Sequence, residues 1–279
     1  MLAPLPVQTL LREHGLQPRK SLGQNFLVED TYLQRIVAAA QVSQADEVLE
    51  IGAGLGSLTR YLAEVAGRVC AVEMDSRFMA ILNQVLKDFS NVTLVNADIM
   101  EMRPQEWMHV PGYLVVANIP YYITSALIRH LLEAPLKPRR IALTIQKEVA
   151  QRVCAQPGDL SLLALSVQVF GAPRVALHIP AGAFYPSPKV DSSLLLIDLY
   201  PEPLLPDEDL RIFFALAKSA FAQKRKMLHN ALAGHPGLGS EGARQLLESA
   251  GIQPERRGQT LSMEEWGRLV REYRLRGQA

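Results

Sequence analysis

Cysteine is scarce in this sequence of 279 residues, and its six histidines are scattered. Two cysteines, Cys70 and Cys154, cannot build a disulfide framework and do not form a CxxC pair, which suits a reducing compartment. The sequence also has no HExxH string and no cluster of cysteine and histidine. It therefore predicts no zinc site, and we expect no metal cofactor.

Long apolar runs are missing as well. The densest run, residues 160–172, is short and is interrupted by serine and glutamine, so no membrane-spanning helix is predicted. The opening string MLAPLPVQTL lacks the basic start and small-residue cleavage site of a signal peptide. We therefore expect a cytoplasmic protein that has no membrane partner.

An excess of charge of one sign is the third absence. The 29 basic and 28 acidic residues leave a formal net charge of +1, so a polyanion would have to be held by a local basic patch. What the chain does have is apolar residues: 48% of it is hydrophobic and 20% is charged, which is enough to bury a full core and excludes a disordered chain.

The first two hundred residues alternate strand and helix signals, the pattern of an α/β fold with a mostly parallel sheet. Apolar and β-branched runs predict strands at 47–54, 68–75, 92–99, 113–120, 140–146, 174–180 and 192–200. Helical periodicity predicts helices between them at 58–66, 77–89 and 124–134. The last two strands are expected to be an antiparallel pair.

The pattern changes after residue 200. Three prolines in residues 200–210 indicate a linker, and only helical signals follow, at 211–233, 242–251 and 263–276. Residues 207–279 carry 12 basic and 9 acidic residues, which leaves 17 and 19 for residues 1–206. We predict an α/β domain over residues 1–200 and a small, slightly basic all-α domain over residues 207–279.

A nucleoside site is predicted where the first two of these strands end. Gly52, Gly54 and Gly56 follow the first strand in EIGAGLG and allow a sharp turn and a close backbone approach to a ligand. Glu73 ends the second strand, 21 residues after Gly52, where a carboxylate accepts hydrogen bonds from both ribose hydroxyls. The turn does not complete G-x-G-x-x-G, which argues against a dinucleotide.

Asp98 follows the third strand at the same edge of the sheet and suits the exocyclic amine of an adenine. Taken alone, NADI predicts an Asx turn that caps a loop; taken with Gly52 and Glu73, it favours the adenosyl site. No P-loop lysine is present, so we expect an adenosyl cofactor without phosphates, S-adenosylmethionine.

The fourth strand ends in Asn118-Ile119-Pro120-Tyr121. The lone pair of an adenine amino group is delocalised into the ring, and two acceptors for its hydrogens would help to localise it on nitrogen. The Asn118 amide oxygen and a neighbouring backbone carbonyl would be these acceptors, Pro120 would stiffen the turn, and Tyr121 would stack on a flipped base.

These motifs resemble those of the ribosomal RNA adenine N6-dimethyltransferases, specifically the KsgA-like enzymes that act on the small subunit. Three further strings strengthen the resemblance: KSLGQNFL at 20–27, QKEVA at 146–150 and AFYPSPKVDSS at 183–193. The resemblance covers nearly the whole chain. It implies a class I, Rossmann-like methyltransferase sheet of seven strands with a small helical domain that binds RNA.

The resemblance also implies roles for individual residues. Cofactor-binding residues would be Asn25, Leu27, Gly52, Glu73, Asp98 and Asn118; the residues at the reaction would be Asn118, Ile119, Pro120, Tyr121 and Phe184. Tyr121 and Phe184 would stack on opposite faces of the target adenine. The family usually has leucine where Ile119 stands, which matters little if the carbonyl is used. Residues 183–193 form a proline-rich loop that contains Phe184, Tyr185 and Ser187.

The implied activity is transfer of methyl groups from S-adenosylmethionine to N6 of two adjacent adenosines in a hairpin loop near the 3′ end of small-subunit (16S) rRNA. S-Adenosylhomocysteine would be the other product, and the assembling 30S-type subunit the partner. We expect a monomer. Lys224, Arg225 and Lys226 are the predicted phosphate contacts, with Arg19, Lys20 and Lys147 as weaker candidates.

Three other functions remain as alternatives. A large-subunit rRNA adenine N6-methyltransferase of the antibiotic-resistance type would share the motifs, although the KSLGQNFL and PKVDS strings favour the small-subunit group. An NAD-dependent dehydrogenase would share the glycine turn and Glu73 but leaves NIPY unexplained. A non-catalytic ribosome-assembly factor would not need Asn118, Tyr121 and Asp98.

Overall fold

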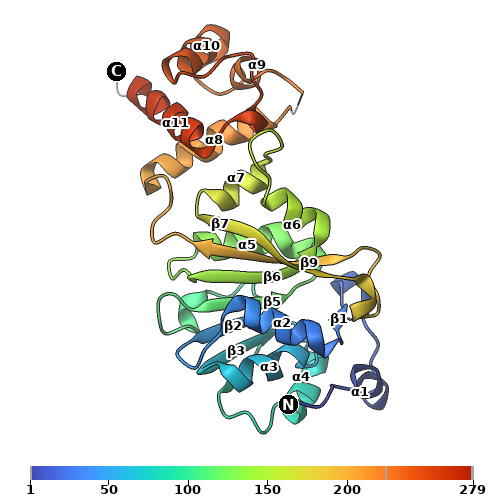
Figure 1. Cartoon of the computed structure of the whole chain (residues 1–279). Coiled ribbons are helices and arrows are strands. Elements are labelled where there is room, and N and C mark those ends of the chain that lie inside the picture. Colours follow the sequence, from blue (N-terminus) through green and yellow to red (C-terminus); the bar gives the residue numbers. More distant parts are fainter. Residues whose placement is uncertain (1, 224, 278–279) are drawn as a thin grey trace. The chain divides into compact units, whose positions relative to one another are not determined.

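The structure, a computed structural model, describes residues 2–223 and 225–277. Within them the chain divides into two compact units (Figure 1). The first comprises Met1–Ala150 and Pro173–Leu199, and the second comprises Gln151–Ala172 and Tyr200–Ala279. The second unit therefore contains residues 151–172, which the sequence analysis placed in the α/β domain.

The first unit is built on a seven-stranded sheet in the order β4-β3-β2-β5-β6-β9-β7, as the resemblance implied. Neighbouring strands from β4 to β6 are parallel, and β9 is antiparallel to β6. The strands are β2 (Glu47–Ile51), β3 (Arg68–Glu73), β4 (Val92–Asn96), β5 (Leu114–Asn118), β6 (Arg140–Gln146), β7 (Gly171–Ile179) and β9 (Ser192–Leu199). All seven begin and end within three residues of the strands predicted from sequence.

Helices α1 (Val7–Glu13), α2 (Asp30–Ala40), α3 (Ser57–Val65) and α4 (Met79–Val85) share a core with alternate residues of the sheet. Successive side chains of a strand point to opposite faces, and in the inner strands most of the intervening residues, such as Leu49, Val115 and Leu143, are buried as well. On α5 (Thr124–Glu133) four apolar residues, Leu127, Ile128, Leu131 and Leu132, form the buried stripe that its sequence predicts. The inner strands are therefore buried on both faces, which is typical of parallel sheets.

Two short strands missed by the sequence analysis tie the N-terminal arm to this unit. β1 (Phe26–Leu27) pairs antiparallel with β8 (Phe184–Tyr185), so Leu27 lies opposite Phe184. Strands of two residues are too short to show a period in sequence. The pair brings the start of the chain beside the proline-rich loop.

The second unit is helical: α6 (Lys147–Val153) leads into it, followed by α7 (Leu162–Gln168), α8 (Asp207–Phe221), α9 (Leu228–Leu232), α10 (Gly239–Ser249) and α11 (Met263–Gly277). Its core includes Phe213 and Trp266, whose rings meet edge to face with centroids 5.9 Å apart. The single helical stretch predicted at 211–233 is two helices, α8 and α9, separated by a turn that contains Arg225 and Lys226.

Candidate functional site

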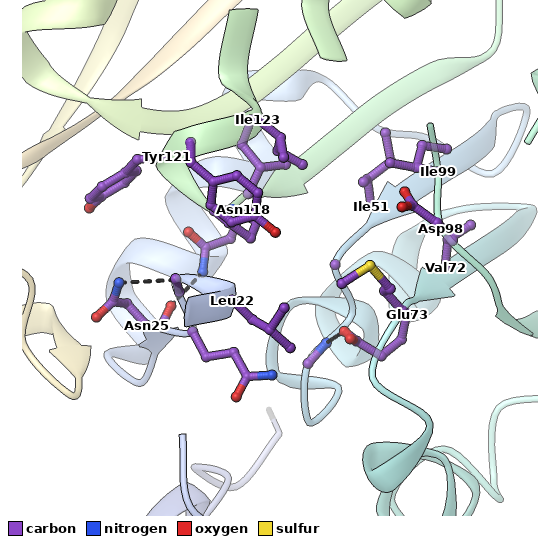
Figure 2. A pocket seen from close by; sticks show the side chains of 18 of the residues that line it. Leu22, Asn25, Ile51, Val72, Glu73, Asp98, Ile99, Asn118, Tyr121 and Ile123 are labelled. Atoms are coloured by element: carbon purple, nitrogen blue, oxygen red, sulfur yellow. Dashed lines mark hydrogen bonds between the residues drawn. The ribbon is translucent and has the colours of Figure 1, made fainter. Parts of the chain in front are cut away.

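A cavity lies at the carboxyl ends of β2, β3, β4 and β5 (Figure 2). β2 and β5 are neighbours in the sheet, and the chain order reverses between them, which is where open α/β sheets bind ligands. The N-terminal arm and the segments after the four strands form its wall: Leu22, Gly23, Gln24, Asn25, Phe26, Ile51, Gly52, Gly54, Val72, Glu73, Met74, Phe78, Ala97, Asp98, Ile99, Met100, Asn118, Ile119, Pro120, Tyr121, Tyr122, Ile123 and Phe184. In Figure 2 Asn118 and Tyr121 lie toward one end of it, and Glu73 and Asp98 toward the other.

Glu73 is fixed at this edge by two backbone N–H groups. The N–H of Gly54 donates to its Oε2 and the N–H of Asp75 to its Oε1, both at 2.8 Å. Burial raises the pKa of Glu73, although these hydrogen bonds favour the charged form. Each oxygen keeps a lone pair for a further donor, so the carboxylate can still accept from two hydroxyls.

Gly54 is required at its position for two reasons. Its φ is +59°, in the left-handed region, and a Cβ there would come within 3.1 Å of the Phe26 ring. The turn therefore accommodates the arm and keeps the N–H of Gly54 directed at Glu73. The glycine spacing predicted a close approach of the backbone to a ligand; in the structure the neighbour of Gly54 is the Phe26 ring.

Asp98 forms the predicted Asx turn at the edge of the cavity. Its Oδ1 accepts from the N–H of Met100 at 2.9 Å, which is an Asx turn, and the residue also lines the cavity. The apolar side chains of Ile51, Val72 and Ile99 line the same part of the cavity. A flat, largely apolar ring that carries an amine donor at its edge would match this surface.

Asn118 ends β5 with its amide beside the arm. Its Nδ2 donates to the backbone carbonyl of Asn25 at 3.1 Å, and the residue lines the cavity. The next residue, Ile119, is buried. Thr124 steadies the turn that follows, because its hydroxyl donates to the carbonyl of Tyr121 at 3.0 Å.

Tyr121 and Phe184, the two predicted stacking residues, line the same cavity although 63 positions separate them in the sequence. The hydroxyl of Tyr121 is hydrogen-bonded to that of Ser192 at 2.7 Å, and burial raises the pKa of Tyr121. Phe184 is buried and belongs to β8. Among the predicted cofactor-binding residues, Leu27 alone is not part of the cavity wall. Its side chain is 2% exposed and it lies opposite Phe184 in the β1–β8 pair, so Leu27 has a packing role.

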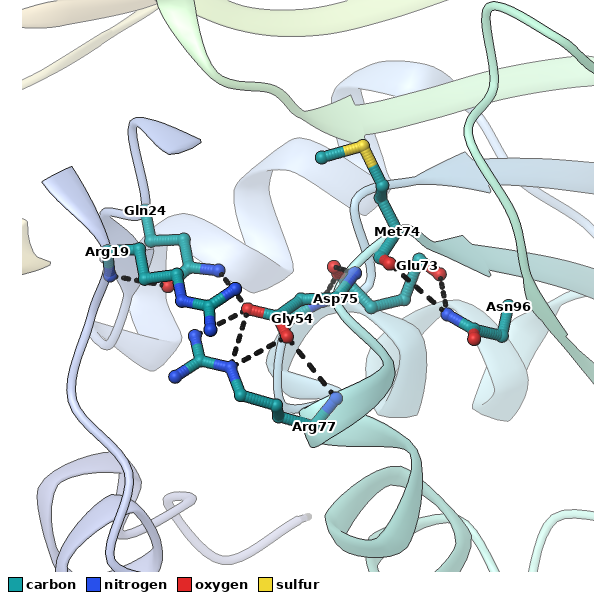
Figure 3. Close-up of polar contacts among 8 residues, drawn as sticks. All are labelled: Arg19, Gln24, Gly54, Glu73, Met74, Asp75, Arg77 and Asn96. Atoms are coloured by element: carbon teal, nitrogen blue, oxygen red, sulfur yellow. Dashed lines mark hydrogen bonds and ion pairs between the residues drawn. The ribbon is translucent and has the colours of Figure 1, made fainter. Parts of the chain in front are cut away.

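A polar network that the sequence analysis missed joins the arm to the end of β3 (Figure 3). The Nε2 of Gln24 donates to Oδ2 of Asp75 at 2.9 Å, and the Oε1 of Gln24 accepts from the N–H of Arg19 at 2.7 Å. Arg77 donates from Nε and Nη2 to the same carboxylate, and these hydrogen bonds lower the pKa of Asp75 to about 2. The only sequence signal was position: Gln24 adjoins Asn25, and Asp75 is two residues past Glu73.

A second carboxyl lies beneath the glycine turn. Glu50 in β2 is 1% exposed, and burial raises its pKa to about 8, with the nearby charge of Glu73 acting in the same direction. Among the described residues no hydrogen-bond partner reaches its Oε2. Glu50 is therefore mainly protonated at neutral pH.

The predicted RNA contacts fall in the second unit. Lys224 lies outside the described residues, whereas Arg225 and Lys226 are exposed in the turn between α8 and α9. The weaker candidates Lys20 and Lys147 are exposed in the first unit. Over residues 2–223 and 225–277 there is no group of three or more His, Cys, Asp and Glu side chains able to hold a metal ion, and no helix with the length and hydropathy of a membrane span.

Comparisons with known proteins show which family the chain resembles. The model of the family described as ribosomal RNA adenine dimethylase matches residues 15–274. The protein named ribosomal RNA small subunit methyltransferase A of Dehalococcoides mccartyi (strain CBDB1) is 43% identical over 266 residues, which covers 95% of this chain and 91% of that protein. The protein of the same name from Moorella thermoacetica is 41% identical over 273 residues, 94% of each chain.

Two solved structures resemble the chain over most of their length. A dimethyladenosine transferase from Plasmodium falciparum superimposes with a TM-score of 0.78 at 25% identity, covering 89% of this chain and 97% of that one. The 23S rRNA methyltransferase ErmE superimposes with a TM-score of 0.73 at 28% identity, covering 88% and 98%. The predicted Rossmann-like methyltransferase fold is confirmed by these neighbours.

Proposed function

Because the chain belongs to the ribosomal RNA adenine dimethylase family, we propose that it methylates N6 of two adjacent adenosines in a hairpin loop near the 3′ end of 16S rRNA. It is an S-adenosylmethionine-dependent rRNA methyltransferase, and N6,N6-dimethyladenosine would be its product during ribosome biogenesis. The names of its relatives support the small subunit as substrate. The observation that carries the proposal is one cavity that holds Asn118 toward one end and Glu73 toward the other.

The cavity fits the donor on three counts. Glu73, 8% exposed, is already aimed by two backbone N–H groups and can accept from both ribose hydroxyls. Asp98 lies beside apolar side chains at the same edge, which suits an adenine and its amine. Gly54 has no Cβ, and a Cβ there would press on the Phe26 ring, which lines the same cavity. S-Adenosylmethionine, when bound, supplies an electrophilic methyl group on a sulfonium.

The protein residues would act on the target adenine. The Oδ1 of Asn118 and the carbonyl of Ile119 would accept the two N6 hydrogens and turn the nitrogen lone pair toward the methyl carbon. Tyr121 and Phe184 would stack on the base and keep water out, so that catalysis comes from positioning and desolvation. The N6 proton would be lost after attack, from a cationic amine, so no general base is needed beforehand.

The partner we propose is the assembling 30S-type subunit. The protein would act in the cytoplasm as a monomer. Lys224, Arg225 and Lys226 would contact phosphates, and Arg225 and Lys226 are exposed in a turn that permits it. With a net charge of +1, binding would rest on a few phosphate contacts and weaken with salt, with a slope set by their number. Specificity would come from RNA shape and unpaired bases.

The test is mass spectrometry of rRNA fragments after purified small and large subunits are incubated separately with labelled donor. We expect dimethylation of two adjacent adenosines of the small-subunit RNA alone; methylation of large-subunit RNA instead would favour the antibiotic-resistance type. Asn118→Ala should abolish transfer while donor binding, measured by calorimetry, stays within a few-fold. Near-normal turnover of Asn118→Ala would contradict the role given to Asn118.

A further inference from the structure

The N-terminal arm touches both parts of the cavity within four residues. Phe26 lies against Gly54 of the glycine turn and meets the Phe78 ring edge to face, with centroids 5.6 Å apart. Gly23 lies against Pro120, since a Cβ at Gly23 would come within 3.1 Å of the Pro120 Cβ. Residues 23–26 therefore connect the side of the donor to the side of the target base.

The arm also sets which way the Asn118 amide points. A backbone carbonyl can only accept, so the amide group that faces the carbonyl of Asn25 at 3.1 Å is the NH₂. The Oδ1 of Asn118 is then directed away from the arm. A flipped amide would present its NH₂ to the N6 hydrogens of the target, placing donor against donor.

Two sets of side-chain hydrogen bonds, from Asn25 itself and from Gln24, fix the backbone that carries the Asn25 carbonyl. The Nδ2 of Asn25 donates to the carbonyl of Gly23 at 3.1 Å, closing a tight local turn. Next to it, the Gln24 side chain bridges the N–H of Arg19 and the carboxylate of Asp75, at 2.7 Å and 2.9 Å. The bond to Asp75 spans 51 positions of sequence and anchors this turn to the sheet.

Asp75 is a rigid anchor. Its side chain is 3% exposed and is bound by Arg77, and its N–H holds Oε1 of Glu73. A continuous chain of hydrogen bonds and peptide units therefore runs from Glu73 through Asp75, Gln24 and Asn25 to Asn118 (Figure 3 shows the first part).

We propose that Gln24 is a positioning residue for methyl transfer: by bonding to Asp75 it keeps the Asn25 carbonyl on the Asn118 amide, so that Oδ1 of Asn118 faces the target N6. This inference rests on the proposed function. Gln24 acts through Asn25 and Asn118, so its loss affects the rate of the chemical step more than the affinity for the donor.

The experiment compares Gln24→Ala with Gln17→Ala, which removes an exposed glutamine seven positions earlier in the same segment. Donor Kd is measured by calorimetry, and kcat with saturating donor on purified small subunits. We expect kcat of Gln24→Ala to fall by about tenfold or more, as misplacement of a reacting group does, with donor Kd changed less than about threefold and Gln17→Ala unchanged. An equal loss in donor affinity would make Gln24 a donor contact, and an unchanged kcat would remove its role; either overturns the proposal.

A rescue pair separates this role from general destabilisation. Gln24→Glu sets a carboxylate against Asp75 and should lower kcat at least as much as Gln24→Ala. Adding Asp75→Asn places an amide N–H donor opposite the new carboxylate, and kcat of the double variant should recover several-fold over that of Gln24→Glu alone. The proposal is contradicted if kcat does not recover in a double variant whose Tm equals that of the wild type. Failure of the proposed function would differ from both outcomes, because the wild-type protein would then transfer no methyl in the same assay.

Discussion

Glu50 provides a test of the site's electrostatics that needs neither RNA nor donor. It is buried in β2 below the glycine turn, with Oε2 unpartnered among the described residues and the charge of Glu73 nearby. Burial raises its pKa from an ordinary value of 4.5 to about 8. Glu50→Gln substitutes a neutral group of the same shape for the protonated acid.

The sign of the effect follows from proton binding. Between pH 4.5 and about 8 the folded protein holds a proton on Glu50 that the unfolded chain has released. The free energy of unfolding must therefore fall as pH rises through this window, by about 1.4 kcal/mol per pH unit. Below pH 4.5 both states are protonated and the contribution vanishes. Across pH 5 to 8 the loss from Glu50 alone is about 3 kcal/mol, an upper bound if water enters on ionisation.

The assay is urea unfolding of the donor-free protein at pH values from 5 to 8. The stability of Glu50→Gln relative to wild type should rise by about 3 kcal/mol over this range, whatever the constant offset from its amide. The control, Glu64→Gln, removes an exposed carboxylate of α3 and measures the effect of one negative charge. Parallel curves for wild type and Glu50→Gln would show that Glu50 titrates alike in both states, which would refute the argument.

Three further predictions concern the cavity and the RNA contacts. Tyr121→Ala should lose about 1–3 kcal/mol of base stacking, measured as kcat/KM. Tyr121→Phe keeps the ring and should keep most activity, while loss of the Ser192 hydrogen bond should lower the free energy of unfolding by about 0.5–1.5 kcal/mol. Equal losses of kcat/KM in the two variants would mean that the ring does not stack. Gly54→Ala should weaken donor binding in calorimetry, since its φ of +59° and the Phe26 ring oppose a Cβ, and an unchanged Kd would contradict this. Changing both Arg225 and Lys226 to Gln should flatten the plot of log affinity against log salt by about one to two in slope, and an unchanged slope would remove both from the RNA contacts.

The sheet and the positions of its ligand-facing ends were predictable because each strand is a short apolar run. Once the order of parallel strands is granted, Gly52, Glu73, Asp98 and Asn118 must lie at one edge, since each ends or follows a strand. The boundary errors have local causes. The helix predicted at 77–89 begins as a 3₁₀ turn, Ser76–Phe78, and its α-helical part ends at Val85, although apolar residues continue beyond.

The long-range contacts were not predictable. Nothing in the string GQNFL indicates that Gln24 reaches Asp75, because the bond depends on how the arm crosses the sheet edge. The pairing of Leu27 with Phe184 likewise joins two strands too short to show a period. The burial of Glu50 was also not predictable from the sequence, since a glutamate before a glycine turn is compatible with either a surface or an interior position.

The carboxylates at the cavity wall show why a structural and a functional interpretation of one residue need not compete. Asp98 closes an Asx turn with one oxygen, and Glu73 receives a backbone N–H on each oxygen. These bonds orient the carboxylates without exhausting their lone pairs. A ligand would therefore meet groups already in place and would not have to supply the free energy of ordering them. The string NADI, taken alone, predicted only that Asp98 closes a turn. The hydrogen bond that closes the turn also orients the Asp98 carboxylate for a ligand.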